Sequence, residues 1–189
     1  MKTELSTDEE RDLITQLPEN PAAFQRLYAH YFPRVFAYVA ARVGREEDAE
    51  DIVAELFLTV VQQINRFEYR GEGSFTAWLF RIAYNAVQQF YRRERKRTHI
   101  PLEDLPHIQS RGLLPDEALE SKERFARLRQ MISSLSDRRR EIITLRFFGE
   151  LRNQEIAEVL GLSEKTVASH LCRGLEDLQR KYQREDAEA

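Results

Sequence analysis

Apolar residues recur at helical spacing along nearly the whole chain, and no stretch shows convincing strand alternation. In the segment from about residue 45 to 64, at about 100° per residue, the apolar side chains fall on one arc of a helix: Ile52, Val53, Leu56, Phe57, Val60, Val61 and Ile64. Ser74 is expected to cap a longer helix that runs to about Arg97. Its predicted buried stripe is Phe75, Trp78, Leu79, Ile82, Ala83, Ala86, Val87 and Phe90. A shorter helix is expected between Pro33 and Gly44. The chain is therefore predicted to be all-α.

Residues 153–172, NQEIAEVLGLSEKTVASHLC, read as two short helices around a glycine turn. Gly161 ends the first helix where the backbone can turn left-handed, and Ser163 caps the second. The expected apolar positions of the second helix are Val167, Leu171, Leu175, Leu178 and Tyr182. This spacing is typical of a helix-turn-helix, whose second helix enters the DNA major groove. The alternative is an ordinary helical hairpin.

The chain is expected to form two small helical domains, residues 21–97 and 117–184, joined by a linker at 98–116. The linker is rich in proline and lacks an apolar stripe, so it is either a simple tether or a segment that lies along a partner's groove. Residues 1–20 are treated as an N-terminal extension, and 185–189 as a disordered tail.

Composition narrows the function classes. The net charge of the 189 residues is −3, and because DNA is also negatively charged, the chain is expected to need a partner to hold DNA well. Residues 92–97 nevertheless carry five cations and one anion, a local basic patch that can bind phosphates. No apolar run could span a membrane, the acidic N-terminus is unlike a signal peptide, and Cys172 is the single cysteine. A cytoplasmic location follows. The four histidines are scattered and no phosphate-binding motif is present, so neither an enzyme nor a cofactor is expected.

Two predicted helices carry polar faces with distinctive chemistry. Opposite the apolar arc of the 45–64 helix lie Asp48, Asp51, Glu55, Leu58 and Gln62. Two interpretations stay open: the acids form a solvated face, or the exposed leucine among them marks a protein contact. The 74–97 helix carries Arg81, Tyr84, Gln88, Tyr91 and Arg92 on its other side, with Asn85 at the border. Aromatic rings stack with bases and arginines follow phosphates, so this face suits single-stranded nucleic acid, unless its tyrosines are partly buried.

Four segments together resemble a bacterial sigma factor of the extracytoplasmic-function (ECF) class: residues 48–60, 75–97, 135–151 and 153–172. The resemblance implies an alternative sigma factor that binds core RNA polymerase, recognises the −35 and −10 promoter elements and promotes melting. Residues 21–97 would be sigma region 2 and residues 117–184 sigma region 4. The rival class is a helix-turn-helix regulator that acts without replacing the sigma subunit.

The resemblance also implies roles for individual residues. Contacts to the clamp helices of the largest polymerase subunit would be Asp48, Asp51, Glu55, Leu58 and Gln62, and region 4 would meet the polymerase flap. The −10 element would be bound by Arg70, Gly71, Glu72, Gly73, Ser74, Arg81, Tyr84, Asn85, Gln88 and Arg92. The −35 element would be read by Lys165, Thr166, Ser169, His170 and Arg173.

This chain departs from the usual family pattern in its recognition helix. Many members read approximately T-V-K-S-R, whereas Ala168 and His170 stand here at the two cationic positions. An unusual −35 preference or a low affinity is expected. The resemblance further suggests an anti-sigma factor as a partner, and no insertion into a membrane.

Overall fold

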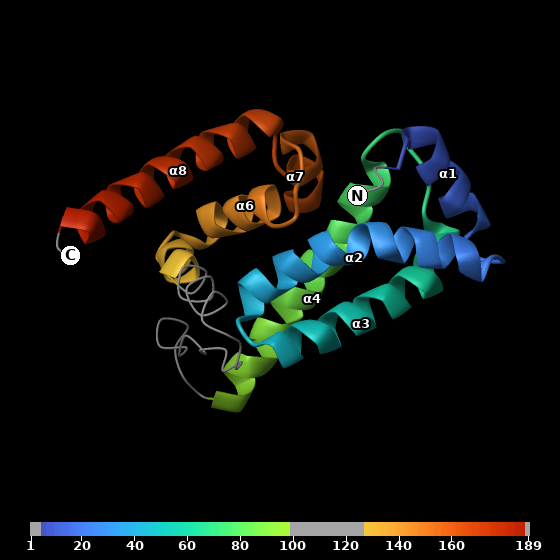
Figure 1. Cartoon of the computed structure of the whole chain (residues 1–189), viewed down its shortest axis with the longest axis horizontal. Coiled ribbons are helices and arrows are strands. Elements are labelled where there is room, and N and C mark those ends of the chain that lie inside the picture. The colour runs from blue at the N-terminus through green and yellow to red at the C-terminus, as the bar shows by residue number, and fades with distance from the viewer. Residues whose placement is uncertain (1–4, 99–126, 188–189) are drawn as a thin grey trace, which may run out of the picture. The chain divides into compact units, whose positions relative to one another are not determined.

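The computed structural model describes residues 5–98 and 127–187, and every regular element within them is helical. The all-α prediction is confirmed. The chain divides into two units, Met1–His99 and Ile100–Ala189, which are described separately (Figure 1). The predicted linker at 98–116 lies outside the described residues, apart from Thr98 at the end of a helix.

The first unit is a bundle of four α-helices. They are α1 (Thr7–Gln16), α2 (Pro21–Val43), α3 (Glu46–Gln63), which continues into the short 3-10 helix Ile64–Arg66, and α4 (Ser74–Thr98). The central helix α2 packs against α1, α3 and α4, and α3 also packs against α4 (Figure 1). The largest fully buried side chains of this core come from α2, α3 and α4, namely Tyr31, Val35, Tyr38, Leu56, Phe75, Leu79 and Phe80.

The prediction that a helix begins after Pro33 is wrong, because Pro33 lies inside α2. The helix begins at Pro21, and the side chain of Asn20 caps it by accepting a hydrogen bond from the N–H of Ala22 at 3.0 Å. Pro33 is exposed, as is Ala29 one turn earlier, whose carbonyl loses its intrahelical donor. Buried Tyr31 and Val35 hold the helix in the core on either side of the proline.

The N-terminal segment treated as an extension contributes a packed helix, α1. A capping box starts it: the hydroxyl of Ser6 accepts from the N–H of Glu9, and the Glu9 carboxylate accepts from the N–H of Ser6. Leu13, Ile14 and Leu17 are buried. The first unit therefore begins before residue 21.

The second unit contains a helical segment at residues 127–133 followed by α6 (Asp137–Phe147), α7 (Asn153–Leu160) and α8 (Glu164–Ala187). α6 and α7 pack against each other and against α8. One core cluster combines Ile132, Leu135 and Ile143 with Phe148, Leu171 and Leu178. The prediction of a disordered tail is wrong for residues 185–187, since α8 continues to Ala187 and no glycine or proline interrupts it after Gly174.

The packing stripe of α8 differs from the predicted one. Leu175 and Tyr182 were expected in the core, but they are 42% and 55% exposed. Gly174 is buried instead, three residues after Leu171 and four before Leu178, so the glycine completes the stripe. Apolar character alone could not reveal this, because a glycine carries no hydrophobic signal. Val61 of α3, also predicted to be buried, is 45% exposed.

Candidate nucleic-acid interface

The outer face of α3 combines acidic groups with exposed apolar surface. Asp51, Glu55 and Gln62 are exposed, and Leu58 between them is 63% exposed. Asp48 is less accessible, with a carboxylate oxygen 3.6 Å from Nε of Arg45. The predicted face is thus present on one side of a single helix, and exposed Val61 extends its apolar part.

The loop between α3 and α4, residues 67–73, is closed by Ser74. Its hydroxyl donates to the carbonyl of Gly71 at 2.6 Å and accepts from the N–H of Arg70 at 3.2 Å. The prediction that Ser74 caps α4 is therefore wrong, because its hydroxyl serves the loop. Gly71 and Gly73 have φ angles of 110° and 79°, a region that favours glycine. The backbone of residues 70–74 thus forms a compact turn at the start of α4.

An aromatic cluster anchors the beginning of this loop. The ring of Phe67 lies against Phe75 and Trp78 of α4, with centroids 5.5 and 5.1 Å apart. Trp78 was predicted to be buried but is half-buried, with Phe67 and Phe75 against its ring. The loop therefore starts from a fixed hydrophobic base.

The outer face of α4 presents the predicted single-strand residues on one side. Arg81, Asn85 and Arg92 are exposed, whereas Tyr84 and Gln88 are half-buried. Tyr91 does not belong to this face: its hydroxyl donates to the carbonyl of Arg42, and the guanidinium of Arg42 lies 5.5 Å from its ring centroid. The rest of the face combines cations, amides and one partly accessible ring, as stacking and phosphate contacts require.

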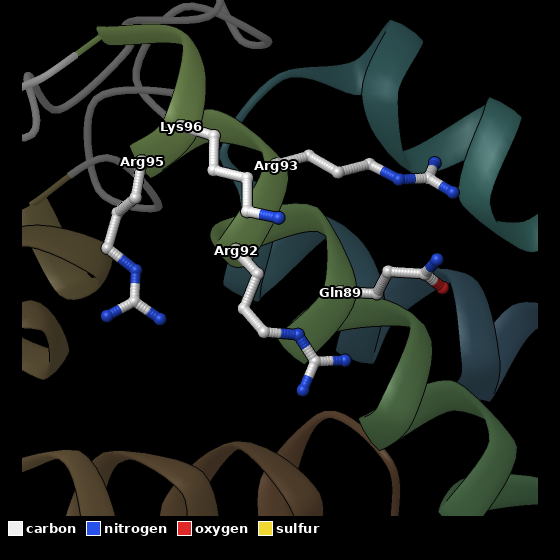
Figure 2. Close-up of a pocket in the computed structure, with 5 residues that line it drawn as sticks. All are labelled: Gln89, Arg92, Arg93, Arg95 and Lys96. Carbon is white, nitrogen blue, oxygen red and sulfur yellow. The ribbon is translucent and has the colours of Figure 1, made fainter.

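The C-terminal end of α4 is strongly basic. Gln89, Arg92, Arg93, Arg95 and Lys96 line a shallow groove, and Figure 2 shows their long side chains extending from successive turns of the helix. Arg92 was predicted as a DNA contact, and the run of cations at 92–97 was the sequence signal for the others. Such a cluster suits a phosphate backbone.

The helix-turn-helix of the second unit has the predicted local geometry. Gly161 adopts the left-handed conformation (φ 65°, ψ 40°) and its N–H donates to the carbonyls of Ala157 and Glu158. The hydroxyl of Ser163 accepts from the N–H of Thr166 at 3.2 Å and so caps α8. These contacts define where α8 begins and which of its faces is accessible.

The predicted reading residues of α8 fall into two groups. Lys165, Ser169 and Arg173 are exposed on one face, one turn apart. The Thr166 hydroxyl lies 2.8 Å from that of Ser163, so it takes part in the cap. His170 is half-buried, and within residues 5–98 and 127–187 its buried Nδ1 has no hydrogen-bond partner. The accessible groups are thus two cations and a hydroxyl, which match the donors that read base edges.

Contacts that the sequence did not indicate support α8 against α6. Arg139 pairs with Asp177 across the two helices, and Arg180 pairs with the same carboxylate. Although desolvation opposes it, hydrogen bonds from Arg180 and Arg139 lower the pKa of Asp177. Because 38 residues separate Arg139 from Asp177, no local pattern could have identified this pair.

Two protein families match the chain. Sigma-70 region 2 matches residues 27–97, and Sigma-70, region 4 matches residues 125–178. The ECF RNA polymerase sigma factor SigW of Bacillus subtilis is 28% identical over 167 residues, which cover 84% of this chain and 88% of that protein. The ECF RNA polymerase sigma-E factor of Escherichia coli K12 is 28% identical over 169 residues, which cover 85% of this chain and 87% of that protein.

Solved structures show the same fold. CnrH, in complex with the cytosolic domain of CnrY, matches with a TM-score of 0.70 and 25% identity over 95% of this chain and 99% of that chain. RpoE of Bartonella quintana, in complex with the anti-sigma factor NepR, matches with a TM-score of 0.67 and 20% identity over 85% of this chain and 96% of that chain.

The paired matches define a sigma-70-type transcription initiation factor, with region 2 in the first unit and region 4 in the second. More narrowly, the chain belongs to the ECF family of RNA polymerase sigma factors. Its function is that of an alternative sigma factor in promoter recognition. The region 2 match decides against the rival class, a regulator that leaves the sigma subunit in place. No helix within residues 5–98 and 127–187 is long and apolar enough to cross a membrane.

Proposed function

We propose that three exposed faces divide the work of initiation: α3 docks on core RNA polymerase, the 67–73 loop and α4 hold the unpaired −10 strand, and α8 reads the −35 duplex. The observation that carries this proposal is that each face is accessible and has the chemistry its partner requires, although the chain as a whole is acidic. We place this proposed function in the cytoplasm, where RNA polymerase acts.

The docking face is argued from Leu58. Leu58 follows Asp51 and Glu55 on the same face of α3 and is 63% exposed, so folding leaves this apolar surface uncovered. A partner with an apolar site and a basic rim would bury it. The clamp helices of the largest polymerase subunit are the proposed partner. The exposed helix face of region 4 is assigned to the polymerase flap on the family resemblance alone.

Core binding tests the docking face. Asp51→Arg combined with Glu55→Arg is expected to abolish binding to core polymerase and run-off transcription, because both changes reverse charge on exposed positions. Asp12→Arg with Glu19→Arg is the matched control, since it makes the same change in net charge at exposed positions outside α3. Wild-type affinity in the α3 variant, or equal loss in the control, would refute the docking assignment.

The −10 assignment relies on preferential binding. A sigma factor makes no covalent bond; it promotes melting by binding unpaired bases better than the duplex. The loop would receive one extruded base, while Tyr84, Asn85, Gln88 and Arg92 hold the neighbouring strand. The basic groove at the end of α4 would contact phosphates of the adjoining duplex.

Promoter opening tests this assignment. Tyr84→Ala or Asn85→Ala is expected to reduce the permanganate reactivity of the −10 thymines while −35 duplex binding stays unchanged, because both residues lie in the first unit. Normal reactivity in both variants would contradict the assignment. The Thr98→Ala variant, at the far end of the same helix, is the control.

An anti-sigma factor is the further proposed partner. The solved relatives CnrH and RpoE were each captured with another protein, and the latter partner is named as an anti-sigma factor. Exposed apolar side chains in both units of this chain, Leu58 in the first and Leu175 and Tyr182 in the second, offer surface that such a protein could cover. Protection of these residues from solvent in a complex would support the proposal.

A further inference from the structure

Helix α1 reaches the loop that is proposed to receive the −10 base. The guanidinium of Arg11 lies 5.7 Å from the ring centroid of Tyr69, in the middle of the loop, and Figure 1 shows the segment between α3 and α4 passing α1. The hydroxyl of Tyr69 is buried. Burial, followed by the nearby carboxylate of Glu10, raises the pKa of Tyr69, although the charge of Arg11 opposes this shift.

A second contact ties α1 to the start of α4. Glu10 is buried, and its carboxylate accepts a hydrogen bond from the hydroxyl of Tyr31 in α2. The same hydroxyl lies 3.1 Å from Oγ1 of Thr76, in the first turn of α4. Burial, followed by the charge of Glu10, raises the pKa of Tyr31, so this phenol stays protonated and can donate to the carboxylate. Three helices therefore meet in one buried chain of hydrogen bonds at the first turn of α4, which directly follows the loop.

The two ends of the loop are already secured without α1. Phe67 stacks on the aromatic cluster of α4, and the hydroxyl of Ser74 closes the turn at Gly71. Between Phe67 and this turn, the backbone of residues 68–70 forms no regular secondary structure. Tyr69 is the side chain through which α1 contacts the centre of the loop.

We propose that α1 holds the 67–73 loop in the shape that receives an unpaired base, with Arg11 as a positioning residue that acts through Tyr69. The inference rests on the proposed −10 function of the loop. A loop that is already ordered loses little conformational entropy when it binds the base. The contact between Arg11 and Tyr69 therefore raises the affinity for DNA although neither side chain needs to touch it. Glu10 and Tyr31 keep α1 in place for this contact.

The test is the affinity of the full chain, bound to core polymerase, for a single-stranded −10 oligonucleotide. Arg11→Ala is expected to weaken binding about two- to fivefold, the value of an exposed cation–π contact. Arg26→Ala removes another exposed arginine, whose 3.8 Å surface ion pair with Glu9 of α1 contributes little and does not involve the loop. It is the matched control and should leave affinity unchanged. The −35 duplex affinity should not change in either variant. Unchanged −10 affinity in Arg11→Ala would overturn the proposal.

Salt dependence separates positioning from direct phosphate binding. If Arg11 only positions the loop, the slope of log affinity against log salt stays that of the wild type. A slope smaller by about 0.7, the value for one phosphate of a single strand, would make Arg11 a DNA contact and overturn the proposal.

Tyr69 completes the test through a double-mutant cycle. Tyr69→Phe should bind like the wild type, because the hydroxyl has no hydrogen-bond partner among the residues that the structure describes. Tyr69→Ala should weaken binding as Arg11→Ala does, and the two changes together should cost no more than either alone. Additive losses would overturn the proposal. Failure of the wild-type complex to bind the −10 strand at all would instead refute the proposed function of the loop.

Discussion

Replacing Gly174 by alanine tests how α8 is held in the second unit. A Cβ at this position would lie 3.2 Å from Cγ1 and 3.3 Å from Cδ1 of Ile143, closer than ordinary van der Waals contact. Ile143 is 1% exposed and packs against Ile132 and Leu135, so it has little room to move. The glycine is therefore required by the close approach of α6 and α8.

The expected magnitude is a balance of two effects. Alanine in place of glycine inside a helix favours folding by about 1 kcal/mol. Overpacking a tight core costs about 1–3 kcal/mol. We expect Gly174→Ala to lower the free energy of unfolding of the second unit by about 1 kcal/mol, within a range of about 0–2 kcal/mol. Because α8 carries the proposed −35 contacts, any shift of its axis should also weaken −35 duplex binding.

The assay needs to resolve the two units. Trp78 is the single tryptophan and belongs to the first unit, so its fluorescence transition in urea serves as an internal control that should not move. Hydrogen exchange of the α6 and α8 amides reports the second unit, and exchange there should accelerate.

A second substitution tests the cause. Ile143→Val removes Cδ1 and by itself costs about 0.5–1.5 kcal/mol. In that background Gly174→Ala should be neutral or stabilising, because one close contact is gone and the remaining methyl groups can shift. Stabilisation of the wild-type chain by Gly174→Ala, with no coupling to Ile143→Val, would refute the packing argument.

Three further predictions concern the second unit. Arg173→Ala should weaken −35 duplex binding by about 1–3 kcal/mol while Arg184→Ala leaves it nearly unchanged, and equal affinity of both variants would remove Arg173 from the site. Glu150 has a φ of 58°, so Glu150→Gly should stabilise the second unit against urea by about 0.5 kcal/mol; a lower midpoint would contradict the strain. A hydrogen bond to Glu176 and its negative charge raise the pKa of the Cys172 thiol, so alkylation at pH 8 should be faster in Glu176→Gln, where more thiolate is present. Identical alkylation rates would show that Glu176 does not control the thiol.

The sequence by itself determined the positions of α3, α4 and α8 and most of the chemistry of their outer faces. Helical periodicity located α3, α4 and α8 to within a few residues, and Gly161 and Ser163 marked the turn of the helix-turn-helix because both act on neighbouring backbone groups. The same periodicity predicted the exposed polar residues Asp51, Glu55 and Gln62 of α3 and Lys165, Ser169 and Arg173 of α8. For these features the physical cause lies within one or two helical turns of the residue concerned.

Only the tertiary structure decided which side chains are committed to other helices. Tyr91 has an aromatic ring that could stack on a base, but its hydroxyl donates to the carbonyl of Arg42, 49 residues away. Helix α1 is joined to the first unit by the hydrogen bond between Glu10 and Tyr31, which are 21 residues apart. Gly174 is buried because α6 approaches α8 at that point. Contacts between residues so far apart in the chain leave no periodic trace, because periodicity records which face of a helix is covered and not what covers it.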